Sequence, residues 1–257
     1  NQSATGIESA EDATLQGDSS PMLWQRLRNL FAGSPRQGGG VVLTLDPAMQ
    51  LAAATGLEGR KGAAVAIDVQ SGAVLTLYSA PSFDPNPLAS LDTAVAEEAI
   101  AALEDDPARP LDNRAIAGNR YAPGSTFKIL TSVALLESGV SPGTEMESPV
   151  STILPGTDTS VSNVDGVECG SGTVTLTEAF ARSCNTTFIL GSQTLPEGAL
   201  QDVTDRFGFG EPLRIPLSVT PSVFPENPDP AQLAMSAIGQ FDVQVTPLEM
   251  ALVAATI

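Results

Sequence analysis

The sequence predicts a mixed α/β (α+β) fold in which an antiparallel sheet packs between helices. Two apolar runs, 63–68 and 73–79, flank a Ser-Gly turn in the manner of a β-hairpin. Both runs are apolar at nearly every position, which is typical of strands covered on both faces. A third stretch, 125–138, predicts a central buried helix because it is apolar nearly all round. With 257 residues and 42% hydrophobic content, the chain can bury the core of one large domain, or of a domain with an appendage.

Start and stop signals place the other elements along the chain. A strand is expected at 41–45, after which Asp46-Pro47 begins a helix that runs to about residue 55. An acidic helix is expected at 92–103, whereas residues 143–174 lack a helical period and predict irregular or short-strand structure. Thr175-Leu176-Thr177-Glu178 is a capping box for the next helix. Later helices are expected at 198–207, at 231–239, and from the N-cap Thr246 with its capping-box Glu249 to Ile257.

The first forty residues read as a lead-in to the compact part. Residues 1–20 are small and polar and predict a loop or extended lead-in, and Pro21 then opens a short amphipathic segment for which Ser20 is the N-cap. Residues 33–40 are rich in glycine, which is typical of a linker. We therefore expect a linker at 1–40 and the compact domain at 41–257.

Composition excludes several functions. The net charge of −18 and the scattered basic residues exclude a nucleic-acid partner, because phosphates would be repelled. The chain has no histidine, so neither a Ser-His-Asp triad nor a histidine metal site is available, and we expect no metal and no other cofactor. Lys61 and Lys128 are the only lysines. No apolar run is long enough to span a bilayer, so membrane attachment is expected only through an anchor outside this chain.

Ser125 and Lys128 are the leading candidates for an activated nucleophile and its base. On a helix, residues three apart lie on one face, and the first turn favours a developing alkoxide. Gly124 allows close backbone approach, and the apolar neighbours of Lys128 favour a neutral amine. The alternative is that Ser125 only caps a helix and that Lys128 only extends its amine to solvent.

The surrounding residues resemble the signature of class B penicillin-binding proteins, in the order of that family and over about residues 41–257. The chain also resembles the penicillin-binding protein A type of actinobacteria, which likewise has an S-C-N-T motif and an upstream cysteine. The matching segments are Leu43-Thr44-Leu45-Asp46-Pro47 with Gln50, the hairpin 62–79 followed by 81–86, Asn113-Arg114-Ala115, Tyr121-Ala122-Pro123-Gly124-Ser125-Thr126-Phe127-Lys128, Ser183-Cys184-Asn185-Thr186, and Gly239-Gln240 with Val245-Thr246-Pro247-Leu248.

This resemblance implies a penicillin-binding transpeptidase or serine β-lactamase-like fold, and a D,D-transpeptidase that cross-links peptidoglycan. Ser125 would be acylated by a D-Ala-D-Ala stem peptide, or by a β-lactam, and Lys128 would be its base. Ser183 would pass the proton to the leaving nitrogen, and Asn185 would hold Lys128 and the substrate amide. The backbone at Gly124 and Ser125 would supply half of the oxyanion hole. Without the resemblance, Ser183 and Asn185 would be read as an ordinary helix exit.

The third motif of this family, K-T-G or K-S-G on an edge strand, is not in the sequence. Lys61 precedes Gly62, and Lys128 precedes Ile129. We therefore expect the chain to be partial, ending before that strand, and to be inactive or nearly so by itself. Residues 1–40 would then be a linker or the remnant of an N-terminal pedestal.

The resemblance also bears on the cysteines, the cellular location and the competing functions. Cys169 and Cys184 are either two buried thiols or one disulfide, and the disulfide is favoured because such domains work at the extracytoplasmic face of the bacterial plasma membrane. Stem peptides, β-lactams and a glycosyltransferase of the cell-wall complex are the expected partners. Alternatives are a D,D-carboxypeptidase, a β-lactamase-like enzyme, and a non-catalytic cell-wall scaffold or β-lactam sensor.

Overall fold

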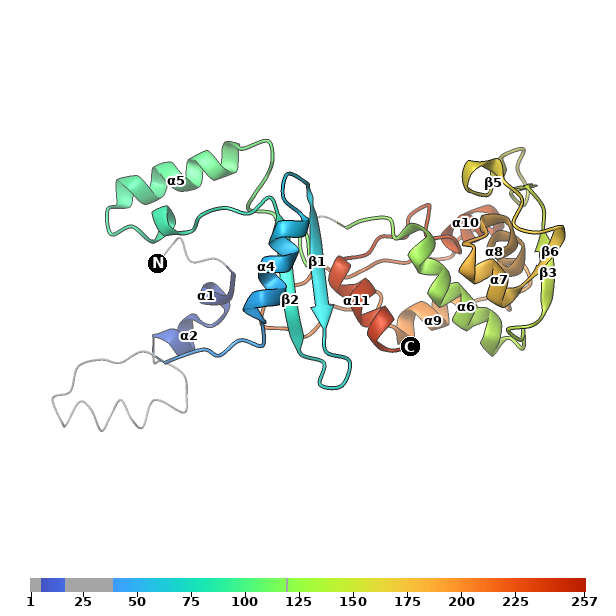
Figure 1. Ribbon diagram of the computed structural model, residues 1–257, viewed down its shortest axis with the longest axis horizontal. Coiled ribbons are helices and arrows are strands. Elements are labelled where there is room, and N and C mark those ends of the chain that lie inside the picture. Colours follow the sequence, from blue (N-terminus) through green and yellow to red (C-terminus); the bar gives the residue numbers. More distant parts are fainter. Residues whose placement is uncertain (1–5, 17–38, 119) are drawn as a thin grey trace. The chain divides into compact units, whose positions relative to one another are not determined.

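The computed structural model describes residues 6–16, 39–118 and 120–257 (Figure 1). The chain divides into two compact units, Asn1–Gly118 with Arg214–Val219, and Asn119–Leu213 with Thr220–Ile257. The amphipathic segment predicted from Pro21, its N-cap Ser20 and most of the linker predicted at 33–40 lie outside the described residues. The predicted boundary near residue 40 therefore stays a prediction. The loop or extended structure expected for residues 1–20 is wrong within 6–16, where the chain forms two short helices.

The first unit is built around one β-hairpin and the helix beside it. Its elements are α1 (Gly6–Ala10), α2 (Asp12–Leu15), α4 (Pro47–Gly56), β1 (Gly62–Ile67), β2 (Val74–Ala80), the 3-10 turn η2 (Asn86–Ala89) and α5 (Thr93–Asp105). β1 and β2 pair antiparallel, from Gly62 opposite Ala80 to Ala66 opposite Thr76, which confirms the predicted hairpin.

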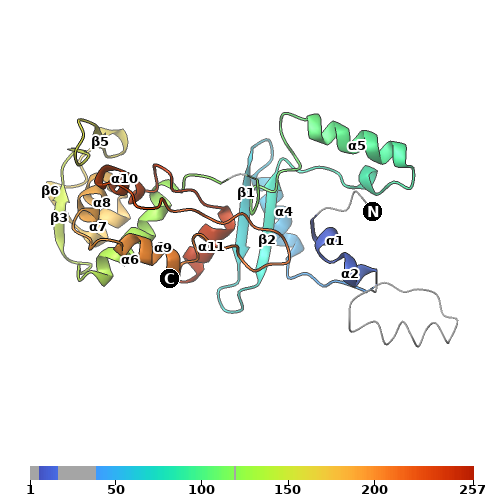
Figure 2. The same cartoon turned by 180° about the vertical axis from the view of Figure 1, so that it is seen from behind.

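Helix α4 lies along one face of this hairpin, as both views show (Figures 1 and 2). Asp46 caps it by accepting hydrogen bonds from the backbone of Ala48 and Met49. Within the two strands only Thr76 and Ala80 are buried, and the other strand residues are half-buried. The cover expected on the second face of the sheet stays a prediction.

The strand predicted at 41–45 is wrong. This segment has no regular secondary structure, and Val42 is 96% exposed. The Gln50 side chain explains why, because its amide donates to the Leu77 carbonyl (3.0 Å) and accepts from the Leu77 N–H (3.1 Å). These are the backbone groups that a neighbouring strand would need.

The second unit holds the remaining elements. They are η3 (Gly124–Phe127), α6 (Lys128–Glu137), β3 (Glu145–Ser148), β4 (Ser151–Ile153), β5 (Ser160–Ser162), η4 (Val164–Gly166), β6 (Gly172–Thr175), α7 (Leu176–Ala181), α8 (Asn185–Ser192), α9 (Ala199–Arg206), α10 (Pro230–Ser236) and α11 (Pro247–Ala255). β3 pairs antiparallel with β6, and β4 pairs antiparallel with β5. Helix α8 packs on α6, α10 and β3, and lies within the helical cluster in both views (Figures 1 and 2).

Two buried clusters pack around the helices α6 and α8. In the first, the Phe127 ring stacks on that of Phe224, with centroids 5.8 Å apart, and meets the edge of Phe209 at 6.0 Å. In the second, Phe188 packs with Cys184 and the buried side chains of α6, α7 and α10. Because Phe127 precedes Lys128 and Phe188 lies on α8, the two clusters fix the start of α6 and the start of α8.

Two of the helix starts in this unit differ from the expectation. The α-helix begins at Lys128, not at Ser125, because residues 124–127 form a 3-10 turn in which Gly124 has a φ of +56°. At α11, Thr246 caps the Glu249 N–H as expected, but the reciprocal bond is missing since the Thr246 N–H donates to the Ser222 hydroxyl. The capping box at Thr175 and Glu178 is confirmed.

Candidate active site

Lys128 is the buried centre of a polar cluster. Its side chain is 1% exposed, and Nζ lies 3.2 Å from Ser125 Oγ and 3.1 Å from Ser183 Oγ. Nζ also donates to the Ser183 carbonyl and to Asn185 Oδ1, both at 2.7 Å. The Phe188 ring closes one side, with its centroid 5.6 Å from Nζ. The structure therefore brings together the four predicted residues Ser125, Lys128, Ser183 and Asn185.

Burial changes the ionisation of this lysine. Removal of the ammonium from water lowers the pKa of Lys128 from 10.5 to about 8. Four oxygens lie within hydrogen-bonding distance of Nζ, so the ammonium, with three N–H groups, and the neutral amine, with two N–H groups and a lone pair, both find partners there. A neutral amine donates twice, to the carbonyl and amide oxygens, and has a lone pair that accepts from a serine hydroxyl. Lys128 is thus suited to take a proton from a serine.

Ser125 is exposed, while Lys128 beside it is buried. The serine lies in the turn η3, where the Thr126 hydroxyl donates to the Pro123 carbonyl at 2.8 Å. On the inner side of the same turn, Phe127 is fully buried in the aromatic cluster. A turn that is anchored on one side and open on the other leaves Ser125 accessible to solvent and keeps its hydroxyl next to Lys128.

Ser183 owes its position to the way α7 ends. The N–H of Ser183 bonds to the Phe180 carbonyl, and the N–H of Cys184 bonds to the Ala179 carbonyl. This pair of bonds is a Schellman motif, whose left-handed residue is usually glycine. Here Ser183 takes that place with a φ of +57°. The helix-exit reading of Ser183 is therefore confirmed, and the exit geometry directs its carbonyl and hydroxyl to Lys128. The functional reading of Ser183 stays a prediction.

Asn185 is the first residue of α8 and bridges two elements. Its Oδ1 accepts from Lys128, and its Nδ2 donates to the Ser162 carbonyl at the end of β5 (3.1 Å). Between the two motif residues, Cys184 forms a disulfide with Cys169, with the Cα atoms 5.9 Å apart. The disulfide ties the loop that carries Ser183 and Asn185 to the segment before β6.

Two groups that contact the clustered residues could not be identified from the sequence. Phe188 belongs to an apolar helix that reads as core, and the Ser162 contact is made by a backbone carbonyl. Only the fold shows that either one lies beside the motif residues.

Other sites are sparse in the part of the chain that the structure describes. No group of three or more cysteine or acidic side chains there is placed to hold a metal ion. None of the helices described there is both long enough and apolar enough to cross a membrane.

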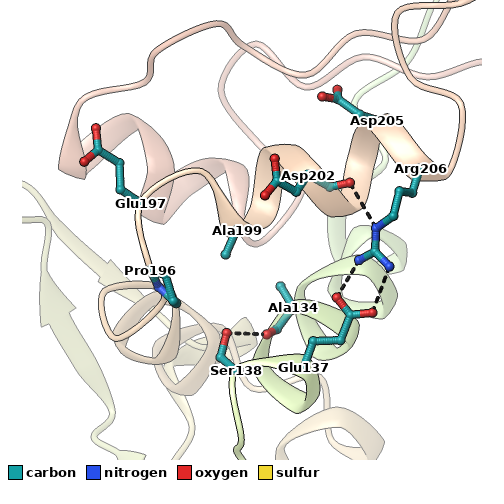
Figure 3. A pocket seen from close by; sticks show the side chains of 9 residues that line it. All are labelled: Ala134, Glu137, Ser138, Pro196, Glu197, Ala199, Asp202, Asp205 and Arg206. Atoms are coloured by element: carbon teal, nitrogen blue, oxygen red, sulfur yellow. Dashed lines mark hydrogen bonds and ion pairs between the residues drawn. The ribbon is translucent and has the colours of Figure 1, made fainter.

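A cavity of about 700 Å³ lies between the C-terminal end of α6 and helix α9 (Figure 3). It is lined by Ala134, Glu137, Ser138, Pro196, Glu197, Ala199, Asp202, Asp205 and Arg206. The Arg206 guanidinium donates to both carboxylate oxygens of Glu137 at its rim. None of the four clustered residues lines this cavity, so it is not the candidate active site.

Comparison with known proteins identifies the family to which this chain belongs. Residues 62–257 match the family described as penicillin binding protein transpeptidase domain. The chain is 43% identical to the peptidoglycan D,D-transpeptidase PbpA of Mycolicibacterium smegmatis, over 99% of this chain and 53% of the relative. It thus spans about half the length of the curated relatives it matches.

Two solved structures are also similar. Penicillin-binding protein A from M. tuberculosis, as a ceftriaxone acyl-enzyme complex, has a TM-score of 0.94 and 40% identity, and covers 98% of this chain and 58% of that one. A structure described as structural coordination of polymerization and crosslinking by a peptidoglycan synthase complex has a TM-score of 0.76 and 35% identity, over 87% of this chain and 42% of that one. Both likenesses support the fold expected from the motifs.

Proposed function

Because this chain belongs to the penicillin-binding protein transpeptidase domain family, we propose that it carries the acylating residues of a peptidoglycan D,D-transpeptidase. One observation carries the proposal. The exposed Ser125 hydroxyl lies 3.2 Å from a buried lysine amine whose pKa is lowered to about 8. A base with a pKa near the working pH is both available as the neutral form and able to take a proton.

In the proposed acylation, neutral Lys128 takes the Ser125 proton as Oγ attacks the carbonyl carbon of the penultimate D-alanine. The carbonyl oxygen becomes an oxyanion, and the proposal assigns the Ser125 backbone N–H to it as a hydrogen-bond donor. The Ser183 hydroxyl lies 3.1 Å from Lys128 Nζ, so it accepts the lysine's proton while giving its own to the leaving nitrogen. The C–N bond then breaks, and D-alanine leaves a serine ester.

In the proposed second half, an amine from a neighbouring stem peptide attacks that ester. The amine loses a proton to Lys128 through the same hydroxyl of Ser183, and the Ser125 oxygen regains one as it leaves. A β-lactam enters by the same first step, since its ring amide presents an equivalent carbonyl to Ser125. Its leaving nitrogen stays attached to the acyl group, which supports slow release.

Partners and location follow from the proposed activity. Stem peptides are the proposed substrates and β-lactams the proposed covalent inhibitors, at the outer face of the bacterial plasma membrane. A partner glycosyltransferase is supported by the likeness to the solved peptidoglycan synthase complex, and by that alone.

The test is covalent labelling of the full-length natural protein with a fluorescent penicillin. We expect a label that survives denaturation and maps to the peptide containing Ser125, and its loss in Ser125→Ala. Ser138→Ala is the matched control, because this exposed serine lies at the other end of α6 and donates only to the Ala134 carbonyl. A label retained by Ser125→Ala contradicts the assignment.

Two further readouts separate the competing activities. Incubation with a D-Ala-D-Ala stem peptide and an acceptor amine should yield the cross-linked product as well as free D-alanine. Hydrolysis alone would indicate a carboxypeptidase, rapid turnover of the penicillin would indicate a β-lactamase, and unaltered cross-linking in cells that carry Ser125→Ala would indicate a scaffold.

A further inference from the structure

We propose that Gly239, at the exit of α10, is a positioning residue. It holds the nucleophile turn, which is η3 with Ser125, through backbone contact alone. The N–H of Gly124, the residue before Ser125, donates to the Gly239 carbonyl at 2.9 Å. Further along the same two segments, Tyr121 and Val245 exchange backbone hydrogen bonds of 2.9 and 2.8 Å. The segment that follows α10 thus runs against the segment that leads to Ser125. The inference rests on the proposed function and deepens it.

The end of α10 places Gly239 there in the same way that the end of α7 places Ser183. The N–H of Gly239 bonds to the Ser236 carbonyl (2.8 Å), and the N–H of Gln240 bonds to the Met235 carbonyl (3.1 Å). This is again a Schellman motif, with Gly239 at a φ of +69°. The ends of two helices therefore contact the chain on either side of Ser125. The end of α7 contacts Lys128, and the end of α10 contacts Gly124.

Left-handed backbone does not by itself explain the glycine, because Ser183 and Phe241 also have positive φ. Space does explain it. A Cβ at residue 239 would lie 2.1 Å from the Gly124 carbonyl oxygen, 2.7 Å from its nitrogen and 2.8 Å from its carbonyl carbon. All three are backbone atoms, which cannot rotate away as the tip of a side chain can. Any side chain at 239 must therefore push the backbone of residue 239 and that of Gly124 apart.

Displacement of Gly124 acts on chemistry because Ser125 is its direct neighbour. The hydroxyl of Ser125 lies 3.2 Å from Lys128 Nζ, while Lys128 itself is held independently by Ser183 and Asn185. A shift of the turn moves the nucleophile and leaves the base in place. Misplacement of a reacting group by about 1 Å costs on the order of 100-fold in rate.

The test compares Gly239→Ala with Gly139→Ala in the full-length natural protein. Gly139 ends α6 in the same motif, with its N–H bonded to the Leu136 carbonyl and a φ of +95°. No atom lies within 4 Å of a Cβ built there, so this control carries the strain of the backbone conformation without the collision. The first-order rate of acylation at saturating penicillin, the affinity of the complex before acylation, and the melting temperature are measured for both.

We expect the acylation rate of Gly239→Ala to fall about 100-fold, with the affinity before acylation unchanged and Gly139→Ala close to wild type. Acylation of Gly239→Ala within a few-fold of Gly139→Ala overturns the inference. So does a Gly239→Ala protein that does not fold even in the cold, because a local displacement leaves the core formed. A wild-type protein that does not react at all contradicts the proposed function, and the inference falls with it.

Discussion

Replacement of Asn185 by aspartate should move the pH dependence of acylation to higher pH. The substitution keeps the shape of the side chain and puts a carboxylate 2.7 Å from Lys128 Nζ, where a neutral amide oxygen now accepts. Burial lowers the pKa of Lys128 to about 8, and no compensating negative charge contributes to that value. A carboxylate at this distance favours the ammonium and so raises the pKa of the lysine.

The size of the effect follows from the fraction of neutral amine. An opposite charge within about 4–6 Å typically moves a pKa by roughly 1–3, so a rise of about 2 is a reasonable expectation. At about pH 8 the neutral fraction then falls from about one half to about 1%, which predicts a roughly 50-fold slower acylation. The deficit should shrink as the pH rises, because both proteins approach the fully neutral amine.

The assay is the rate of acylation by a chromogenic β-lactam over the range from about pH 6 to pH 10. Asn227→Asp is the matched control, since it adds the same charge at an exposed position in the same unit. The substitution at 185 also removes the donor to the Ser162 carbonyl, so a loss of about 1–3 kcal/mol in the free energy of unfolding is expected and is measured in parallel. An unchanged pH midpoint in Asn185→Asp refutes the role of Lys128 as the titrating base.

Three further predictions concern stability. Burial raises the pKa of Glu249 from 4.5 to about 7. The contribution of Glu249 to the free energy of unfolding is therefore fully present below pH 4.5 and is lost as the pH rises through about 7. In urea unfolding at about pH 8, Glu249→Gln should recover up to roughly 3 kcal/mol, whereas the exposed control Glu147→Gln should not, and an equal gain in both contradicts this. Alkylation without reductant should leave the mass unchanged, and loss of the disulfide through Cys169→Ser with Cys184→Ser should cost about 3 kcal/mol in the same assay; two alkylated thiols exclude the bond. Glu137→Gln should barely change the free energy of unfolding, because the ion pair of Glu137 with Arg206 is exposed. A large fall in the free energy of unfolding would contradict this and show that the ion pair is coupled to the packing around the nearby cavity.

The lengths and ends of several helices were readable from local sequence because capping is a short-range interaction. Asp46 and Thr175 each bond to backbone N–H groups two or three residues away, and the structure has both caps. The strand predicted at 41–45 failed for the opposite reason, since a strand exists only with a partner. The groups it needed at Leu77 are bonded to the Gln50 side chain, which no periodicity in the sequence reports.

The same distinction between short-range interactions and contacts between distant segments applies to the site. The sequence by itself determined that Ser125 and Lys128 share one face, because three residues of helical chain fix that separation, and the lack of histidine left Lys128 as the candidate base. The apolar neighbours of Lys128 predicted a lowered pKa, but only the tertiary structure decided that the amine is buried enough for that pKa to fall to about 8, and that Ser183, 55 residues further on, meets the same amine. Desolvation and contacts between distant segments depend on how the whole chain packs. For that reason neither the state of the base nor the contact of Gly239 with Gly124 can be read from spacing.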